Sequence, residues 1–233
     1  MNAQAGLNKI YKTQIKLKNH FIMPLRNKAI TKEVQDLLTP IKVLQDFIEG
    51  NSRFIRNELN TIDHKALISQ TADGQHPKAI VLSCIDSRVP VELIFDQTIG
   101  DIFVARVAGN FENTDILGSM EYSCKVAGSK LVFVLGHESC GAIKAACDHV
   151  KLGNITSLLE NIQPAVKLSE TQVKGKHDSS NNEFIIKTTE NNVQLTIQRI
   201  REKSPILKEM EENGEIKIIG GVYQISNGKV TLL

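Results

Sequence analysis

The chain has no tryptophan, few aromatic residues of any kind and only four cysteines among its 233 residues. So few cysteines in a chain of this length exclude a small secreted fold held by disulfides, and we expect a reducing, cytoplasmic compartment. No apolar run approaches the roughly 18 residues that span a bilayer, so no membrane partner is expected. The formal net charge of +2 gives no electrostatic support for binding to nucleic acid.

Acidic residues are also absent from the first 32 residues, whereas lysine and arginine recur there. This asymmetry predicts a basic arm over residues 1–38, either a flexible solvated segment or an organelle-targeting peptide. Lysine outnumbers arginine, which favours the solvated arm, because targeting peptides prefer arginine and serine. We expect residues 39–233 to form a single domain, since no linker or internal repeat divides them.

Three short apolar segments rich in β-branched residues are typical of buried strands: residues 79–84, 102–107 and 130–135. Helical stretches follow or separate them, so we expect an α/β fold with a mainly parallel central sheet covered by helices. The dipeptide Asn227-Gly228 lies between the segments 216–225 and 229–233. Because this dipeptide favours a tight turn, it predicts a C-terminal β-hairpin.

Helices are expected where apolar residues recur at helical spacing. Thr39 and Pro40 are suited to the cap and first turn of a helix that continues to residue 56 and belongs to an N-terminal helical arm. The polar stretch 174–183 is expected to be an exposed loop. The remaining helices are predicted over residues 114–127, 140–150, 154–172 and 190–212.

Two short motifs, CIDSRVP at residues 84–90 and GHESCG at residues 136–141, carry residue types that bind metals. Cys84 is expected at the carboxyl end of its strand and His137 just past the end of another, where open α/β sheets place functional loops. Cys140 should begin a helix, whose dipole favours the thiolate. A lone buried cysteine is usually a small hydrophobic residue, but three such residues predict zinc with one open position. Catalytic rather than structural zinc keeps that position open.

Asp86 and Arg88 add a feature that a structural zinc site does not need. A carboxylate two residues from a metal ligand can accept a proton or a hydrogen bond from a metal-bound water. The rigid fork of arginine can hold that carboxylate through two hydrogen bonds. An exposed Asp–Arg pair is common and contributes little by itself, but its position beside Cys84 favours a catalytic role.

At these motifs the sequence resembles the β-class carbonic anhydrases, zinc enzymes that interconvert carbon dioxide and bicarbonate. The resemblance covers most of residues 39–233 and rests on CIDSRVP, GHESCG, ARVAGN at 105–110 and GSMEY at 118–122. It implies a lyase with one zinc ion per subunit and a reaction through zinc-bound hydroxide that yields bicarbonate and a proton. It also implies Cys84, His137 and Cys140 as zinc ligands and Asp86 with Arg88 as the catalytic dyad.

The family has two active-site types, one of which has an allosteric bicarbonate pocket with a tryptophan three residues before the first cysteine. Val81 holds that position here, so the resemblance implies the plant-type arrangement. The residues at the plant-type substrate positions are Gln75, Phe103, Ala108, Tyr122 and Gly141. Ala108 replaces a valine of the family pattern, which changes the expected shape of the pocket.

Two other functions use the same residues. A hydrolase of carbonyl sulfide or carbon disulfide would have the same fold and zinc ligands, so the sequence leaves it open. A zinc-binding module without turnover is disfavoured by the intact Asp86 and Arg88. Family resemblance further implies a homodimer or homotetramer in which the N-terminal helices pack on a neighbouring subunit, and a small-molecule substrate, carbon dioxide or bicarbonate.

Overall fold

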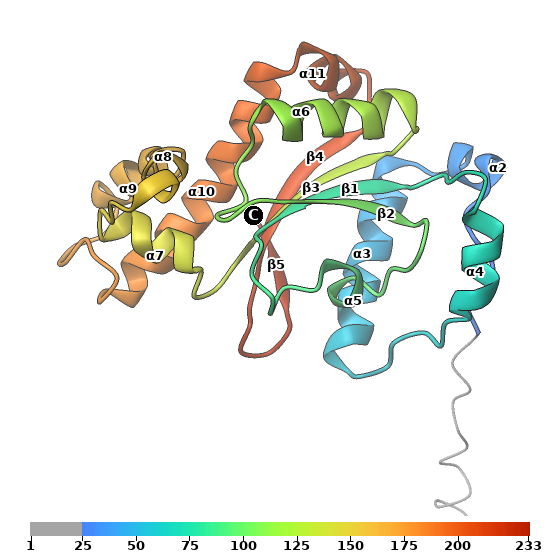
Figure 1. The fold of residues 1–233 in the computed structure, drawn as a ribbon, viewed down its shortest axis with the longest axis horizontal. Helices are drawn as coiled ribbons and strands as arrows, with labels where there is room; N and C mark the ends of the chain where they lie inside the picture. The colour runs from blue at the N-terminus through green and yellow to red at the C-terminus, as the bar shows by residue number, and fades with distance from the viewer. Residues whose placement is uncertain (1–24) are drawn as a thin grey trace, which may run out of the picture.

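A central sheet organises the protein, whose computed structural model describes residues 25–233 (Figure 1). The sheet has five strands in the order β2-β1-β3-β4-β5. Four run parallel and β5 pairs antiparallel with β4. This arrangement confirms the expected α/β fold with its C-terminal hairpin. The strands are β1 (Ala79–Ser83), β2 (Ile102–Arg106), β3 (Leu131–His137), β4 (Lys217–Tyr223) and β5 (Val230–Leu232).

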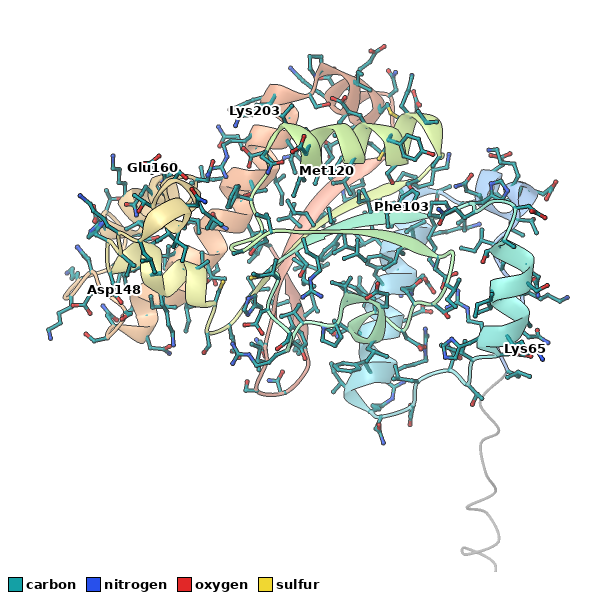
Figure 2. The ribbon with its side chains drawn as sticks, in the orientation of Figure 1. Lys65, Phe103, Met120, Asp148, Glu160 and Lys203 are labelled. Carbon is teal, nitrogen blue, oxygen red and sulfur yellow. The ribbon has the colours of Figure 1, made fainter. Side chains whose placement is uncertain are left out.

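Both faces of the sheet are covered, because alternate side chains of the central strands point to opposite sides. Ile80 of β1 and Val132 of β3 belong to a core shared with α6 (Thr114–Glu121), α10 (Asn182–Lys203) and α11 (Pro205–Glu212). Figure 2 shows Met120 on α6, where it is buried in this core. On the opposite face, Val81 and Phe133 pack with α3 (Pro40–Ile55) and α5 (Val91–Ile94).

A third apolar cluster lies beyond the carboxyl edge of the sheet. It joins α7 (Gly141–Cys147), α8 (Gly153–Glu160) and α9 (Gln163–Glu170) to the beginning of α10. Cys84 and Cys140 are members of this cluster. The helices that surround the candidate metal ligands therefore have a core of their own, at one end of the sheet (Figure 1).

The helix that begins at Pro40 is confirmed, and its start follows the expected chemistry: the Thr39 side chain accepts a hydrogen bond from the Lys42 N–H. The expected helix 190–212 ends where the structure ends it, at Glu212, but it begins too late and is interrupted. Its first part, α10, begins at Asn182, where the Asn181 side chain caps it. Ser204 then separates α10 from α11, and Pro205 occupies the first turn of α11, because proline cannot continue a helix.

Two other expected helices are interrupted. The predicted helix 154–172 is divided into α8 and α9 at residues 161–162, with a proline in the first turn of α9. The predicted helix 114–127 is α6 followed by a π-helical turn, Tyr122–Val126. Three short helices were not expected: α2 (Lys32–Asp36), α4 (His64–Thr71) and α5. Segments of four to eight residues carry too few apolar repeats to show a helical period.

The expected basic arm is described only from residue 25 onward, and residues 1–24 lie outside the described part. Arg26 forms a bridge with Ile62 and an ion pair of 2.8 Å with the buried Asp101. The final portion of the segment 1–38 is thus attached to the domain. Within residues 25–233, no helix combines the length and apolarity that a membrane span requires.

Candidate metal centre

The strand order places the candidate ligands together. From β1 the chain moves outward to β2 and then returns across β1 to β3, so the direction of winding reverses between β1 and β3. Ligands bind at the carboxyl ends of strands where this reversal occurs. Cys84 directly follows β1, as expected. His137 was expected just past a strand ending at residue 135, but β3 extends to residue 137, so His137 is its last residue.

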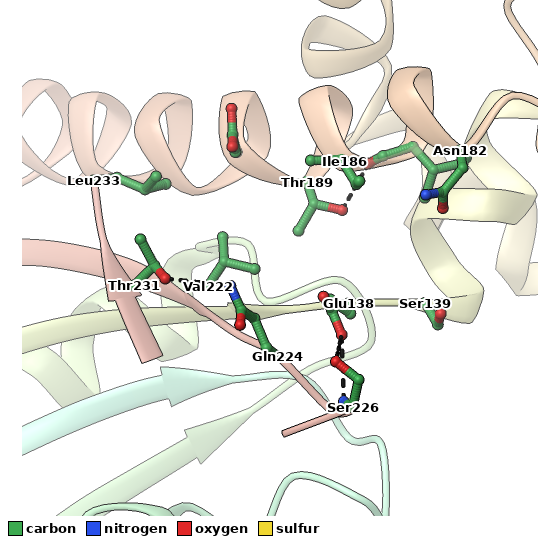
Figure 3. A pocket seen from close by; sticks show the side chains of 12 residues that line it. Glu138, Ser139, Asn182, Ile186, Thr189, Val222, Gln224, Ser226, Thr231 and Leu233 are labelled. Carbon is green, nitrogen blue, oxygen red and sulfur yellow. Dashed lines mark hydrogen bonds between the residues drawn. The ribbon is translucent and has the colours of Figure 1, made fainter. Parts of the chain in front are cut away.

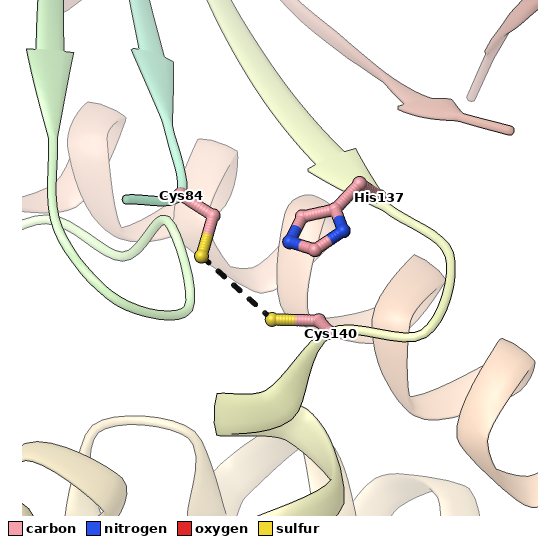
Figure 4. A group of neighbouring side chains, drawn as sticks. All are labelled: Cys84, His137 and Cys140. Carbon is pink, nitrogen blue, oxygen red and sulfur yellow. Dashed lines mark hydrogen bonds between the residues drawn. The ribbon is translucent and has the colours of Figure 1, made fainter. Parts of the chain in front are cut away.

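Cys84, His137 and Cys140 converge from three elements, with Cys140 capping the start of α7 (Figure 4). Their ligand atoms all lie within 4.8 Å of one another, and all three residues are buried. The sulfurs of Cys84 and Cys140 are 3.9 Å apart. Tetrahedral zinc with Zn–S bonds of about 2.3 Å places two sulfurs about 3.8 Å apart. The separation of the two sulfurs therefore fits zinc.

The histidine ring is oriented for metal binding. His137 Nδ1 lies 2.8 Å from the carbonyl oxygen of Glu138, so Nδ1 carries the proton and Nε2 the free lone pair. Nε2 is buried without a hydrogen-bond partner among the described residues. A buried, unpaired nitrogen directed toward two sulfurs is the arrangement of a metal ligand with its supporting hydrogen bond.

The sulfurs of Cys84 and Cys140 share a hydrogen bond. The hydrogen bond from the Cys140 thiol lowers the pKa of Cys84 to about 4. The same bond raises the pKa of Cys140, outweighing the N–H groups at the start of α7. The N–H groups of Ala142 and Ile143 at the start of α7 still act in the expected direction, since they lower the pKa of Cys140. Binding of a divalent cation would displace the proton of this hydrogen bond, since thiolates are the ligand form.

Asp86 and Arg88 form the expected pair beside the ligands. Arg88 Nε and Nη2 donate to the two carboxylate oxygens of Asp86 at 3.0 and 2.8 Å. These bonds hold the pKa of Asp86 well below its usual range. Asp86 Oδ2 also lies 3.9 Å from His137 Nε2. The carboxylate thus lies at the edge of the metal centre, held by Arg88 rather than directed into it.

The donor set leaves one coordination position open. Among residues 25–233, the side chains that could hold a metal at this centre are Cys84, His137 and Cys140. The Asp86 carboxylate is paired with Arg88 instead. Two thiolates and one imidazole are suited to zinc, and three protein ligands with an open fourth position are typical of catalytic zinc. The arrangement is therefore suited to activating a small molecule.

The residues expected in the substrate pocket lie in two places. Ala108 precedes Gly109, whose N–H contacts the Cys84 sulfur, and Gly141 directly follows Cys140. Phe103 and Tyr122 lie elsewhere, with ring centroids 6.3 Å apart. Phe103 pairs with Ile80 near the beginning of β1 and lies far from α7 in Figure 2. Gln75 is exposed and lies before β1, outside any helix or strand. A single chain therefore does not bring all five residues together.

Sequence reasoning missed several residues that support the centre. Arg106 donates to the backbone carbonyls of Cys84 at 2.8 Å and Asp86 at 2.6 Å, which fixes the loop between them. Arg106 lies inside the ARVAGN motif, so the motif could have identified it. Asn192 donates to the Gly109 carbonyl at 2.8 Å. Its position in the middle of a helix gave no comparable signal.

A cavity of about 400 Å³ adjoins the loop that carries His137 and Cys140 (Figure 3). It lies between α10 and the C-terminal hairpin, with Glu138 and Ser139 on one side. The Glu138 carboxylate accepts hydrogen bonds from the N–H and hydroxyl of Ser226. The hairpin thereby fixes Glu138, whose carbonyl oxygen orients the ring of the candidate ligand His137.

Comparison with known proteins agrees with this geometry. A family described as "Carbonic anhydrase" matches residues 79–230. This chain belongs to that family. Carbonic anhydrase 2 of Mycobacterium tuberculosis is 33% identical over 202 residues, which cover 83% of this chain and 92% of that protein. The carbonic anhydrase of Mycolicibacterium smegmatis is 31% identical over 202 residues, with coverages of 83% and 93%.

Solved structures place the chain in the β class of carbonic anhydrases. The β-carbonic anhydrase CafA of Aspergillus fumigatus superposes with a TM-score of 0.64 at 26% identity, covering 83% of this chain and 89% of that chain. A β-carbonic anhydrase of Coccomyxa, solved with acetazolamide, shares the fold with a TM-score of 0.65 at 22% identity. The family expected from the motifs is confirmed, and the protein is a carbonic anhydrase.

Proposed function

We propose that this carbonic anhydrase holds one zinc ion per subunit on Cys84, His137 and Cys140 and catalyses the reversible hydration of carbon dioxide to bicarbonate and a proton. The observation that carries the proposal is the 4.8 Å convergence of these three ligand atoms around a position that no fourth described side chain fills. When bound, zinc supplies a Lewis acid that makes water a nucleophile near neutral pH.

Asp86 and Arg88 have distinct tasks in this proposal. Asp86 accepts a hydrogen bond from the reacting water and orients it, because its carboxylate stays ionised at neutral pH. Arg88 holds that carboxylate away from the metal with its two donors, and its Nη2 also reaches the Ser139 carbonyl at 3.4 Å. In a closed state without the Arg88 pair, Asp86 itself would occupy the fourth metal position.

The decisive experiment measures carbon dioxide hydration by stopped flow and zinc content on the same sample. We expect about one zinc per subunit, loss of zinc in Cys84→Ser, and loss of activity with retained zinc in Asp86→Ala. Carbonyl sulfide and carbon disulfide are assayed in parallel. Sulfide release at a rate above carbon dioxide hydration would assign the protein to the hydrolase alternative, and full zinc occupancy in Cys84→Ser would reject the ligand set.

We also propose a plant-type substrate pocket that is completed in a homodimer or homotetramer. Gln75, Phe103 and Tyr122 are separated from the metal ligands of their own chain, so a second copy must supply them. Strand β2 is an edge strand whose first four residues are apolar and half-buried, and such edges are usually covered. Light scattering after size exclusion tests the assembly, and a monomer contradicts it. A cytoplasmic location stays a prediction of the sequence.

Mixing two inactive variants tests whether the pocket is shared. Cys84→Ser removes the metal but keeps Tyr122, whereas Tyr122→Ala keeps the metal ligands. A mixed dimer has one intact site only if the two halves come from different subunits, so refolding the variants together should restore about a quarter of the wild-type activity. No recovery in mixed dimers would place both halves in one chain. Full activity of Tyr122→Ala alone would remove Tyr122 from the pocket.

A further inference from the structure

A backbone N–H contacts the metal-ligating sulfur of Cys84. The amide of Gly109 donates to this sulfur at 3.4 Å. Gly109 has a φ of +82°, and a Cβ at this position would lie 2.5 Å from Ile162 Cδ1. Only glycine fits this conformation and this close packing. The turn at Gly109 therefore requires glycine, and its orientation sets the direction of the hydrogen bond from the Gly109 N–H to the Cys84 sulfur.

The side chain of Asn192 holds this turn from α10. Asn192 is 1% exposed, and its Nδ2 donates to the Gly109 carbonyl at 2.8 Å. Its Oδ1 is buried and has no hydrogen-bond partner among the described residues. A buried amide with an unpaired oxygen destabilises a core relative to an apolar side chain of similar size. Fold stability alone does not explain an asparagine here.

The same helix contacts the strand that ends at His137. Val193 Cγ2 occupies the space beside Gly136, where an added Cβ would lie 2.7 Å from it. Adjacent residues of α10 therefore contact the backbone next to two different ligands, Asn192 on the Cys84 side and Val193 on the His137 side. The position of α10 therefore influences how far apart Cys84 and His137 lie.

We propose that Asn192 is a positioning residue of the metal centre: it fixes the Gly109 turn so that the Gly109 N–H is directed at the Cys84 sulfur. A hydrogen bond to a thiolate ligand draws electron density from the sulfur and fixes its orientation toward the metal. Residues that support metal ligands in this way change metal affinity or activity by about 10–100-fold. This inference rests on the proposed zinc site.

The chain offers a matched control in the preceding residue. Asn191 is also on α10 and also 1% exposed. Its Nδ2 donates to Ser169 Oγ at 2.8 Å and to Gln172 Oε1 at 2.9 Å, neither of which is bonded to a metal ligand. Replacing either asparagine removes a buried amide from the same helix. Only the change at Asn192 removes support from the Gly109 turn.

The experiment compares wild-type protein with Asn192→Leu and Asn191→Leu. Zinc affinity is measured by competition with a chromophoric chelator, and the sulfur-to-metal charge-transfer band is recorded after cobalt substitution. For Asn192→Leu we expect zinc affinity lower by about 10–100-fold and a band at lower energy, because the sulfur becomes more electron-rich. Asn191→Leu should show the wild-type affinity and band, whatever its thermal stability.

Wild-type affinity and band position in Asn192→Leu would overturn the inference, as would equal changes in Asn191→Leu. If Asn192→Leu does not fold, Asn192→Ser replaces it. The serine side chain is too short to reach the Gly109 carbonyl, so we expect the same spectral shift. A wild-type protein that binds no zinc would instead reject the proposed function. The two failures are thus distinguished by the wild-type sample.

Discussion

Asn51 of α3 connects three parts of the protein, and its replacement should destabilise the fold. Its Nδ2 donates to the carbonyls of Ile94 at 3.2 Å and Gly228 at 2.8 Å. Its Oδ1 accepts from the Val230 N–H at 2.9 Å. The side chain therefore fixes the C-terminal hairpin, whose loop also carries Ser226, the partner of Glu138 beside the metal centre.

The magnitude follows from these three bonds. A neutral hydrogen bond contributes about 1 kcal/mol net, so Asn51→Leu should lower the free energy of unfolding by about 3 kcal/mol. The carbonyls of Ile94 and Gly228 that lose their partner belong to buried residues. Water cannot replace the lost hydrogen bonds there, so the full loss is expected. For a domain of this size, 3 kcal/mol corresponds to a decrease in Tm of about 6–12 °C.

Thermal and urea unfolding at one fixed protein concentration measure this effect, because assembly would make Tm depend on concentration. Gln45→Ala is the control: Gln45 lies on the same helix, but it is exposed, and within residues 25–233 its side chain bonds only to exposed Glu49. Its unfolding free energy should stay within about 0.5 kcal/mol of the wild type. An Asn51→Leu protein that is less than about 1 kcal/mol destabilised would refute the reasoning.

Three further predictions concern the titratable groups. Arg88→Ala should lower the rate of carbon dioxide hydration by about a hundredfold at unchanged zinc content, because Asp86 loses both guanidinium donors and keeps only the backbone N–H of residue 88; a normal rate would remove Arg88 from the dyad. Since the pKa of Asp86 is depressed, its ion pair is present above the ordinary carboxylate pKa and is lost only on acidification below it. Carbon-13 spectra should therefore show no titration of Asp86 above about pH 4, and a midpoint near neutrality would contradict the geometry. Burial raises the pKa of Cys124 to about 12 and of Cys147 to about 11, so neither thiol should react with iodoacetamide at pH 8 in the native protein; peptide mass spectra showing rapid modification of either would contradict this burial.

Short sequence patterns predicted the strands and helices that a few neighbouring residues are enough to identify. The runs at 79–84 and 130–135 became β1 and β3, because their short length and β-branched residues favour a buried strand over a helix. The predicted helix over 190–212 was less accurate, since polar residues at its true beginning, including Asn182 and Glu183, resemble a loop in composition. Composition cannot show that the Asn181 side chain caps a helix there.

The sequence by itself identified the candidate metal ligands. Cys84 and the pair His137 and Cys140 stand out because thiolate and imidazole are zinc ligands and because strand ends and helix starts can be recognised locally. Asp86 and Arg88 were found for the same reason: two residues separated by one position in a loop can reach each other without help from the rest of the chain.

Only the tertiary structure decided how those ligands meet and what supports them. The order β2-β1-β3-β4-β5 places β1 beside β3, which brings Cys84 to residues more than fifty positions away in the chain. Asn192 reaches Gly109 across 83 positions, and nothing in the residues around either one indicates the contact. Such contacts arise from the packing of α10 against the sheet, where the side chains of many distant segments together determine one arrangement.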